Sequence, residues 1–342
     1  MMYTTTSTTR SFFLSITKAS KWNQRALFKR PSLRQFSASQ QQESGSGDTH
    51  EDRVVTTLDS ATGIATVELN RPDKLNALDL RMFHAIRDAA VALRDNRSVR
   101  AVILQGRGRA FCTGLDVASF GRDATNPLTA MRQLLERSDA NNVANLAQDV
   151  AYAWRTLPVP VICAVHGTCF GGGLQIALGA DLRLVTADCK LSVMEAKWGL
   201  IPDMSASVTL RELVSIDVAK ELTWTGKIVS GEEAARLGLC TRVVPDPAAE
   251  ARALAEQIIR GSPDATSAAK EMFHKTWAAP SASYCLRVET ELQERLLLGW
   301  NQMAAASRSA LGWKVPYFQR QKERPLQTLD EEDEEEYQED KK

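Results

Sequence analysis

The chain of 342 residues lacks several features that would assign it to a common functional class. No apolar run approaches the roughly eighteen residues that a membrane-spanning helix needs. The 42 basic residues balance the 42 acidic ones, so no overall charge attracts nucleic acid or a membrane surface. The hydrophobic share of 44% is ordinary for a globular protein. We therefore expect a globular protein with neither nucleic acid nor a membrane as its partner.

The cysteines and histidines also lack a metal-binding pattern. The six cysteines include no Cys-x-x-Cys pair, and none has metal-type spacing with the four histidines. Most of the cysteines lie in apolar runs, which favours small core residues in a reducing compartment. We expect no metal site and no catalytic role for His166. The cysteines are Cys112, Cys163, Cys169, Cys189, Cys240 and Cys285.

The first fifty residues differ in kind from the rest. No Asp or Glu occurs between Met1 and Ser37, whereas Arg, Lys, Ser and Thr are frequent and Ser11–Ile16 supplies an apolar face. This composition is typical of a mitochondrial transit peptide. We expect residues 1–50 to be this peptide and a polar linker, with the mature protein in the mitochondrial matrix. A plain disordered tail and a chloroplast address are the alternatives.

The other end of the chain is acidic. Nine of the eleven residues from Asp330 to Asp340 are carboxylates. Such a run repels itself and stays solvated, which predicts a disordered tail over residues 319–342.

Between these ends, the periodicity of apolar residues predicts an α/β core over residues 51–250 and a helical region over residues 251–318. Short β-branched runs alternate with helical segments in the first part, which favours buried parallel strands. Gly63 is expected in a hairpin turn, and Ser230 with Glu233 forms a capping box. The predicted strands are 54–58, 64–69, 101–105, 161–166, 182–186 and 190–193, and the predicted helices include 78–94, 128–157, 206–213, 248–260, 264–276 and 281–307.

Gly171-Gly172-Gly173 is the most informative stretch of the chain. It follows an apolar run that reads as a buried strand and precedes a short helical segment, Gln175–Asp181. A free amide at such a helix start can donate to a developing negative oxygen. Tight packing alone is the alternative explanation for the glycines.

Three further segments accompany the glycines: Asn70–Leu78, Gly106–Asp116 and Leu191–Ser205. In this order and at these spacings, the four segments resemble the crotonase family, the enoyl-CoA hydratases and isomerases, from Val54 to Tyr317. The resemblance implies a crotonase (ClpP/crotonase-like) fold, an α/β spiral of ββα turns. It also implies that the C-terminal helical region builds a homotrimer or a dimer of trimers. Independently, that region carries much apolar surface, which favours either a subunit contact or burial on the chain's own core: Leu286, Leu292, Leu296, Leu297 and Trp300.

The resemblance also implies a substrate and an oxyanion hole. Family members bind an acyl-CoA and polarise its thioester carbonyl with two backbone amides, here those of Leu115 and Gly172. Coenzyme A is part of the substrate, so no separate cofactor is expected. Arg71 and Lys74 are candidates for contacts with CoA phosphates, and Trp198 either lines the acyl tunnel or packs in the core, which we favour. The other substrate-binding positions that the resemblance implies are Lys74, Leu75, Ala77, Thr113, Gly114, Asp116 and Gln175.

The carboxylates decide the reaction. Hydratases of this family hold a water with two glutamates, and the matching positions here are Gln175 and Glu195. Gln175 cannot accept a proton at neutral pH, although it can orient a water or a carbonyl. This argues against ordinary hydration, which needs an acid and a base together.

Asp203 stands eight residues after Glu195, the spacing found in the family's dienoyl-CoA isomerases, where the two groups face each other across the substrate. We therefore expect an isomerase of fatty-acid β-oxidation with Glu195 and Asp203 as catalytic residues. The alternatives for these residues are a helix cap at Met204 for Asp203 and a surface salt bridge for Glu195. The alternative functions are an enoyl-CoA hydratase that depends on Glu195, a thioester hydrolase, and a non-catalytic scaffold or RNA-binding protein.

Overall fold

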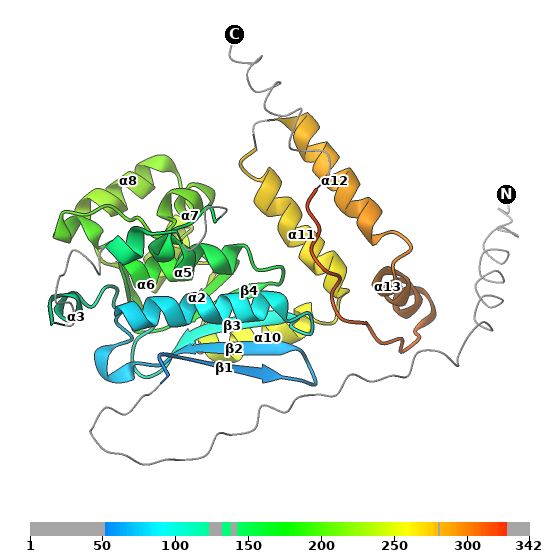
Figure 1. Ribbon diagram of the computed structural model, residues 1–342, viewed down its shortest axis with the longest axis horizontal. Helices are drawn as coiled ribbons and strands as arrows, with labels where there is room; N and C mark the ends of the chain where they lie inside the picture. Colours follow the sequence, from blue (N-terminus) through cyan, green and yellow to red (C-terminus); the bar gives the residue numbers. More distant parts are fainter. Residues whose placement is uncertain (1–51, 123–131, 138–141, 280, 327–342) are drawn as a thin grey trace, which may run out of the picture. The chain divides into compact units, whose positions relative to one another are not determined.

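The computed structural model describes residues 52–122, 132–137, 142–279 and 281–326 (Figure 1). The predicted transit peptide and the acidic run after Leu326 lie outside the described residues. Within them, the chain is an α/β protein, as the alternation of strands and helices predicts. No helix of the described part is long and apolar enough to cross a membrane.

The main sheet has six strands in the order β1-β2-β3-β4-β6-β9. β1 and β2 form the predicted antiparallel hairpin, and Gly63 has the left-handed φ of 75° that its turn requires. All other neighbours in this sheet are parallel. The strands are β1 Val54–Asp59, β2 Ile64–Leu69, β3 Ala101–Gly106, β4 Val161–Val165, β6 Leu182–Val185 and β9 Arg242–Val243.

Alternate residues of the central strands enter two different cores, because successive side chains of a strand point to opposite faces. Val67, Leu104 and Cys163 belong to the larger core, whereas Ile103 and Ile162 pack with a smaller one. Helices thus cover both faces of the sheet. On the larger core lie α2 (Leu80–Asp95) and α5 (Leu146–Arg155), and on the smaller one lies α10 (Pro247–Ile258).

A second, three-stranded sheet in the order β5-β7-β8 positions the candidate site. β5 (Thr168–Phe170) and β7 (Lys190–Ser192) are parallel, so their carboxyl ends lie at the same edge. The glycine triplet follows β5 and opens α6 (Gly172–Leu178), and Glu195 follows β7. The Gly171 N–H donates to Ser192 O at 2.9 Å, which ties the two strand ends together. The third strand is β8, Val229–Ser230.

Two predicted helices differ in the structure. The predicted helix 128–157 is not continuous, since Asn145 caps α5 with a full capping box that makes it a helix start. The predicted helix 281–307 is two helices, because Leu298 adopts a left-handed φ of 60° and Gly299 caps the second one. The predicted capping box at Ser230 is only half formed among the described residues: the Ser230 hydroxyl accepts the Glu233 N–H, whereas the Glu233 carboxylate pairs with Lys227 at 3.5 Å. The remaining helices are η1 Pro72–Lys74, α3 Val117–Arg122, η2 Glu195–Trp198, α7 Ala206–Leu213, α8 Ile216–Thr225, α9 Gly231–Leu237, α11 Pro263–Thr276, α12 Ala282–Leu296 and α13 Trp300–Leu311.

The C-terminal segment is ordered beyond the boundary predicted at residue 318. Arg320 is only 3% exposed and donates to Arg94 O at 3.0 Å, and Leu326 packs against Val288 and Leu292. A tail that begins at residue 319 is therefore wrong for residues 319–326. The sequence pattern missed this because Arg320 is held through backbone carbonyls, which leave no mark in composition.

The apolar surface predicted for the C-terminal helices is only partly covered within the chain. Leu292 is buried, while Leu286 and Leu297 are 61% and 53% exposed. Trp300 stacks on Phe318 of the C-terminal segment, with ring centroids 4.7 Å apart. The homotrimer or dimer of trimers stays a prediction.

Candidate active site

The loops of residues 74–78 and 113–116 are far apart in the sequence but pair with each other through backbone hydrogen bonds. The Leu78 N–H donates to Gly114 O, and the Asp116 N–H donates to Leu78 O. Thr113 is joined in the same way to Leu75, which has a left-handed φ of 52°. The predicted binding segments 74–78 and 113–116 therefore form one structural unit.

This pairing turns the Leu115 amide away from Leu78. In a parallel bridge, one residue bonds to the two neighbours of its partner, so the partner's own N–H points to the other side. The glycine triplet lies beside this loop: a Cβ on Gly114 would lie 3.5 Å from the Gly172 nitrogen. Within the described part of the chain, neither the Leu115 N–H nor the Gly172 N–H donates a hydrogen bond. Both predicted donors are thus free to bind a ligand.

Glu195 lies directly against the glycine triplet. A Cβ on Gly171 would lie 3.3 Å from its Oε1 atom, so the glycine leaves room for the carboxylate. Oε1 accepts a hydrogen bond of 2.6 Å from Gln175 Nε2, whereas Oε2 is buried and has no hydrogen-bond partner among the described residues. Burial raises the pKa of Glu195, and the negative charge of Asp203 adds to the effect. A surface salt bridge is the wrong interpretation, since no described cation pairs with Glu195.

Asp203 lies near Glu195, in the loop that leads from η2 to α7. Desolvation by the surrounding protein raises its pKa as well. The helix-cap alternative is wrong, because α7 begins at Ala206 and its N-cap is Ser205, whose hydroxyl donates to Gln148 O instead. Two neighbouring carboxyl groups thus have raised pKa values, and such perturbed groups are typical of functional sites.

Asn76 is a residue that the sequence interpretation missed. It is fully buried in the 74–78 loop and has a left-handed φ of 56°. Its Nδ2 group donates to the carbonyls of Arg107, Ala110 and Phe111, and its Oδ1 accepts the Arg71 N–H. Asn tolerates this backbone conformation better than most residues. An Asn within an apolar loop was the available signal for this positioning role.

Arg71 is held within the protein rather than free for a phosphate. Its guanidinium donates to Asp116 Oδ2 at 2.7 Å and to Ala77 O at 3.0 Å, and it lies 3.7 Å from Asp79, the N-cap of α2. Burial acts to raise the pKa of Asp116, but hydrogen bonds from Ser119 and Arg71 outweigh it and lower this pKa. The arginine therefore ties the 71–78 loop to the residue that follows Leu115.

We expect Arg71→Met to lower the free energy of unfolding by about 2 kcal/mol, a value between those of exposed and buried ion pairs. The reason is that Asp116, whose side chain is only 13% exposed, loses its cation. Urea denaturation measures the change. Arg87→Met is the matched control, because Arg87 pairs with Asp88, which is 64% exposed. A higher KM with unchanged stability would instead return Arg71 to a phosphate contact.

The other predicted positions surround these groups. Lys74 ends η1 and is exposed, and the Ala77 carbonyl accepts from Arg71. Trp198 is 63% exposed at the end of η2, so our prediction that it packs in the core is wrong. A tryptophan that follows an apolar strand reads as core in sequence, but the short helix after β7 turns it outward.

The buried cysteines and His166 serve the scaffold. Five cysteines are buried and Cys285 is partly exposed, all with free thiols. Burial raises the pKa of Cys112 to about 12, which keeps its thiol protonated. His166 Nε2 lies 2.8 Å from Gly108 O and helps to hold the loop before Phe111. Among the described residues, no group of three or more His, Cys, Asp or Glu side chains could hold a metal.

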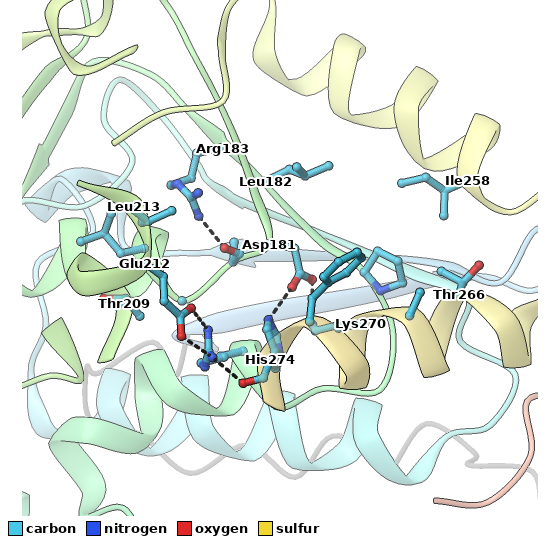
Figure 2. Close-up of a pocket in the computed structure, with 17 residues that line it drawn as sticks. Asp181, Leu182, Arg183, Thr209, Glu212, Leu213, Ile258, Thr266, Lys270 and His274 are labelled. Carbon is cyan, nitrogen blue, oxygen red and sulfur yellow. Dashed lines mark hydrogen bonds and ion pairs between the residues drawn. The ribbon is translucent and has the colours of Figure 1, made fainter. Parts of the chain in front are cut away.

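A pocket of about 390 Å³ lies at the other end of α6, between that end, α7 and α11 (Figure 2). Four of its charged groups form ion pairs, Lys270 with Asp181 at 2.7 Å and Arg155 with Glu212 at 2.5 and 2.8 Å, and Arg183 donates to backbone carbonyls. Lys270 also donates to the carbonyls of Trp154 and Val159. These contacts hold α11 on the core, and they leave the candidate chemistry at the glycine end of α6.

Two unpaired amides beside a buried carboxylate define a class of site, one that polarises a carbonyl and moves a proton next to it. Comparison with known proteins identifies the family. The protein-family model described as enoyl-CoA hydratase/isomerase matches residues 59–298. The chain belongs to this family, and it has the crotonase fold.

Individual relatives agree with this assignment. The chain is 31% identical over 236 residues to a protein of Rhodobacter capsulatus named "Probable enoyl-CoA hydratase". The matched region covers 68% of this chain and 86% of that protein. The structure of an enoyl-CoA hydratase from Mycobacterium smegmatis matches with a TM-score of 0.67 and 26% identity, over 78% of this chain and 99% of that one. A Thermobifida fusca YX protein described as an enoyl-CoA hydratase, solved in complex with CoA, matches with a TM-score of 0.63 and 27% identity, over 72% and 93%.

Proposed function

We propose that the protein shifts double bonds in a dienoyl-CoA thioester, as an isomerase of fatty-acid β-oxidation in the mitochondrial matrix. The observation that carries the proposal is the makeup of the carboxyl pair. Glu195 has a buried oxygen without a partner among the described residues, and Asp203 is the neighbouring carboxyl group whose charge influences the pKa of Glu195. The position where a second glutamate would hold a water is Gln175, whose side chain is bonded on both sides within the protein.

The proposed reaction needs one proton acceptor and one proton donor. The thioester oxygen accepts hydrogen bonds from the Leu115 and Gly172 amides, and Glu195 takes a proton from C2 of a 3,5-dienoyl chain. The electrons of that C–H bond move into an extended enolate that reaches C6, and Asp203 delivers its proton to C6, which leaves the 2,4-dienoyl product. Desolvation raises the pKa of Asp203, the direction that suits a proton donor. After turnover the exposed Asp203 regains a proton from water, and the partly exposed Glu195 releases the one it took.

Hydration is the second candidate, because the relatives compared above are named as hydratases. In that reaction Glu195 alone would have to activate the water and return its proton. Incubation of the purified protein with 2-enoyl-CoA and with 3,5-dienoyl-CoA separates the two. We expect the absorbance of a conjugated dienoyl thioester to appear from the second substrate. Loss of the first substrate's absorbance without conjugation of the second would establish hydration instead.

Asp203→Asn should lower the rate of dienoyl isomerisation by about 100-fold, the lower range for loss of a general acid or base. An amide keeps the size of the side chain but cannot deliver a proton at neutral pH. Because Asp203 caps no helix, the thermal midpoint should stay within about a degree of the wild type. Asp188→Asn, at an exposed turn before β7, serves as the control. Full activity of Asp203→Asn would remove the aspartate from the mechanism.

A further inference from the structure

The side chain of Gln175 bridges the two parts of the site that carry carboxyl groups. It is 1% exposed, on the buried helix α6. Its Oε1 accepts the Met204 N–H at 2.8 Å, and its Nε2 donates to Glu195 Oε1 at 2.6 Å. Met204 directly follows Asp203, so one amide group contacts both the base and the segment that holds the second carboxyl.

The backbone decides which way this amide faces. A peptide N–H can only donate, so the atom of Gln175 that meets Met204 must be the oxygen. The amino group must then face Glu195, and it can only donate as well. It therefore requires an acceptor, which an ionised carboxylate supplies at either oxygen.

We infer that Gln175 is a positioning residue: it commits Oε1 of Glu195 and leaves Oε2 as the single oxygen that takes the substrate proton. The inference rests on the proposed function. Oε2 is the atom that is buried without a partner among the described residues. Oε1 accepts the hydrogen bond from Gln175 and lies beside Gly171, 3.3 Å from where a Cβ would stand. Through Met204 the same amide fixes where the loop of Asp203 begins.

A glutamate at position 175 would change how the pair of side chains at positions 175 and 195 is protonated. A carboxylate could still accept the Met204 N–H, but its other oxygen would face Glu195 with no proton to donate. Two carboxylates this close must share a proton, which raises the pKa of one of them. Gln175 thus makes Glu195 the only group of this pair that changes its protonation state.

The test compares Gln175→Met and Gln175→Glu with the wild type. Methionine has a similar length and removes both hydrogen bonds, whereas glutamate keeps the one to Met204. The acidic limb of the kcat/KM profile should move up by about one pH unit in Gln175→Met, because a lost hydrogen bond to an ionised group favours its protonated form. It should move at least as far in Gln175→Glu. Below the limb, this shift corresponds to a loss of about tenfold.

Gln105→Met is the matched control, since Gln105 makes an equivalent hydrogen bond to Glu68 at 3.0 Å on the main sheet. Its pH profile should equal that of the wild type. If both Gln175 variants are folded and active with unmoved profiles, Gln175 only fills the core and the inference is wrong.

A second measurement does not depend on activity. The infrared band of the Glu195 carboxylate, obtained as the difference between a protein and its Glu195→Gln counterpart, titrates with pH in the substrate-free enzyme. The midpoint should be higher in the Gln175 variants. If the protein has no isomerase activity but its Gln175 variants still show this shift, the proposed function is contradicted and the role of Gln175 is kept. If the enzyme is active and the shift is absent, the role of Gln175 is contradicted and the proposed function is kept.

Discussion

Glu195→Gln should lower kcat for dienoyl-CoA by about 1,000-fold, in the middle of the range for removal of a general base. The amide keeps the shape of the side chain, and its oxygen can still accept from Gln175 Nε2, so the fold should be retained. What it cannot do is take a proton from carbon. Stopped-flow or steady-state absorbance of the conjugated product measures the loss, with KM expected to change little because the oxyanion donors are untouched.

The pH dependence of kcat/KM in the wild-type enzyme tests the same role of Glu195 as the base. Since burial raises the pKa of Glu195 above the ordinary 4.5, the base becomes protonated at a higher pH than a normal glutamate. kcat/KM should therefore fall with decreasing pH around a midpoint above 4.5, and this limb should be absent in Glu195→Gln. Glu271→Gln is the control, because burial also raises the pKa of Glu271 but it lies on α11. A Glu195→Gln enzyme within tenfold of the wild type would exclude Glu195 as the base.

The second large effect is expected from Gly114→Ala, with a loss of at least about 100-fold in kcat, the value for removal of one oxyanion donor. Gly114 has a left-handed φ of 86°, which L residues adopt at a cost. An added Cβ would also lie 2.8 Å from the Phe170 carbonyl oxygen, which belongs to β5 and cannot move aside easily. The peptide that carries the Leu115 N–H must shift instead.

The effect should appear in kcat more than in KM, because an oxyanion hole binds the enolate more strongly than the ground-state carbonyl. The Gly312→Ala variant separates the cost of a left-handed φ from the steric contact that an added Cβ makes at residue 114. Gly312 has a similar φ of 66°, but an added Cβ there would meet nothing within 4 Å. That variant should be slightly destabilised and fully active. If a folded Gly114→Ala enzyme turned over normally, the Leu115 amide would have no part in catalysis.

Local patterns predicted most of the elements around the site. Short apolar, β-branched runs gave the strands, and the left-handed φ at Gly63 agrees with the predicted hairpin turn. The helix break at Leu298 could not be predicted in this way, because leucine favours a helix and its φ of 60° depends on the surrounding chain. Trp198 was misplaced for a similar reason, since hydrophobicity alone does not tell which way a short helix after β7 faces.

The sequence by itself determined the fold class, the order of the four loops and the residue types available for chemistry, because backbone preferences and glycine turns act over a few neighbouring residues. Only the tertiary structure decided how those residues are bonded. Arg71 meets Asp116 across 45 positions and Gln175 meets Glu195 across 20. Such partners depend on which strand ends share an edge, and no pattern in either segment records which oxygen of Glu195 is left free.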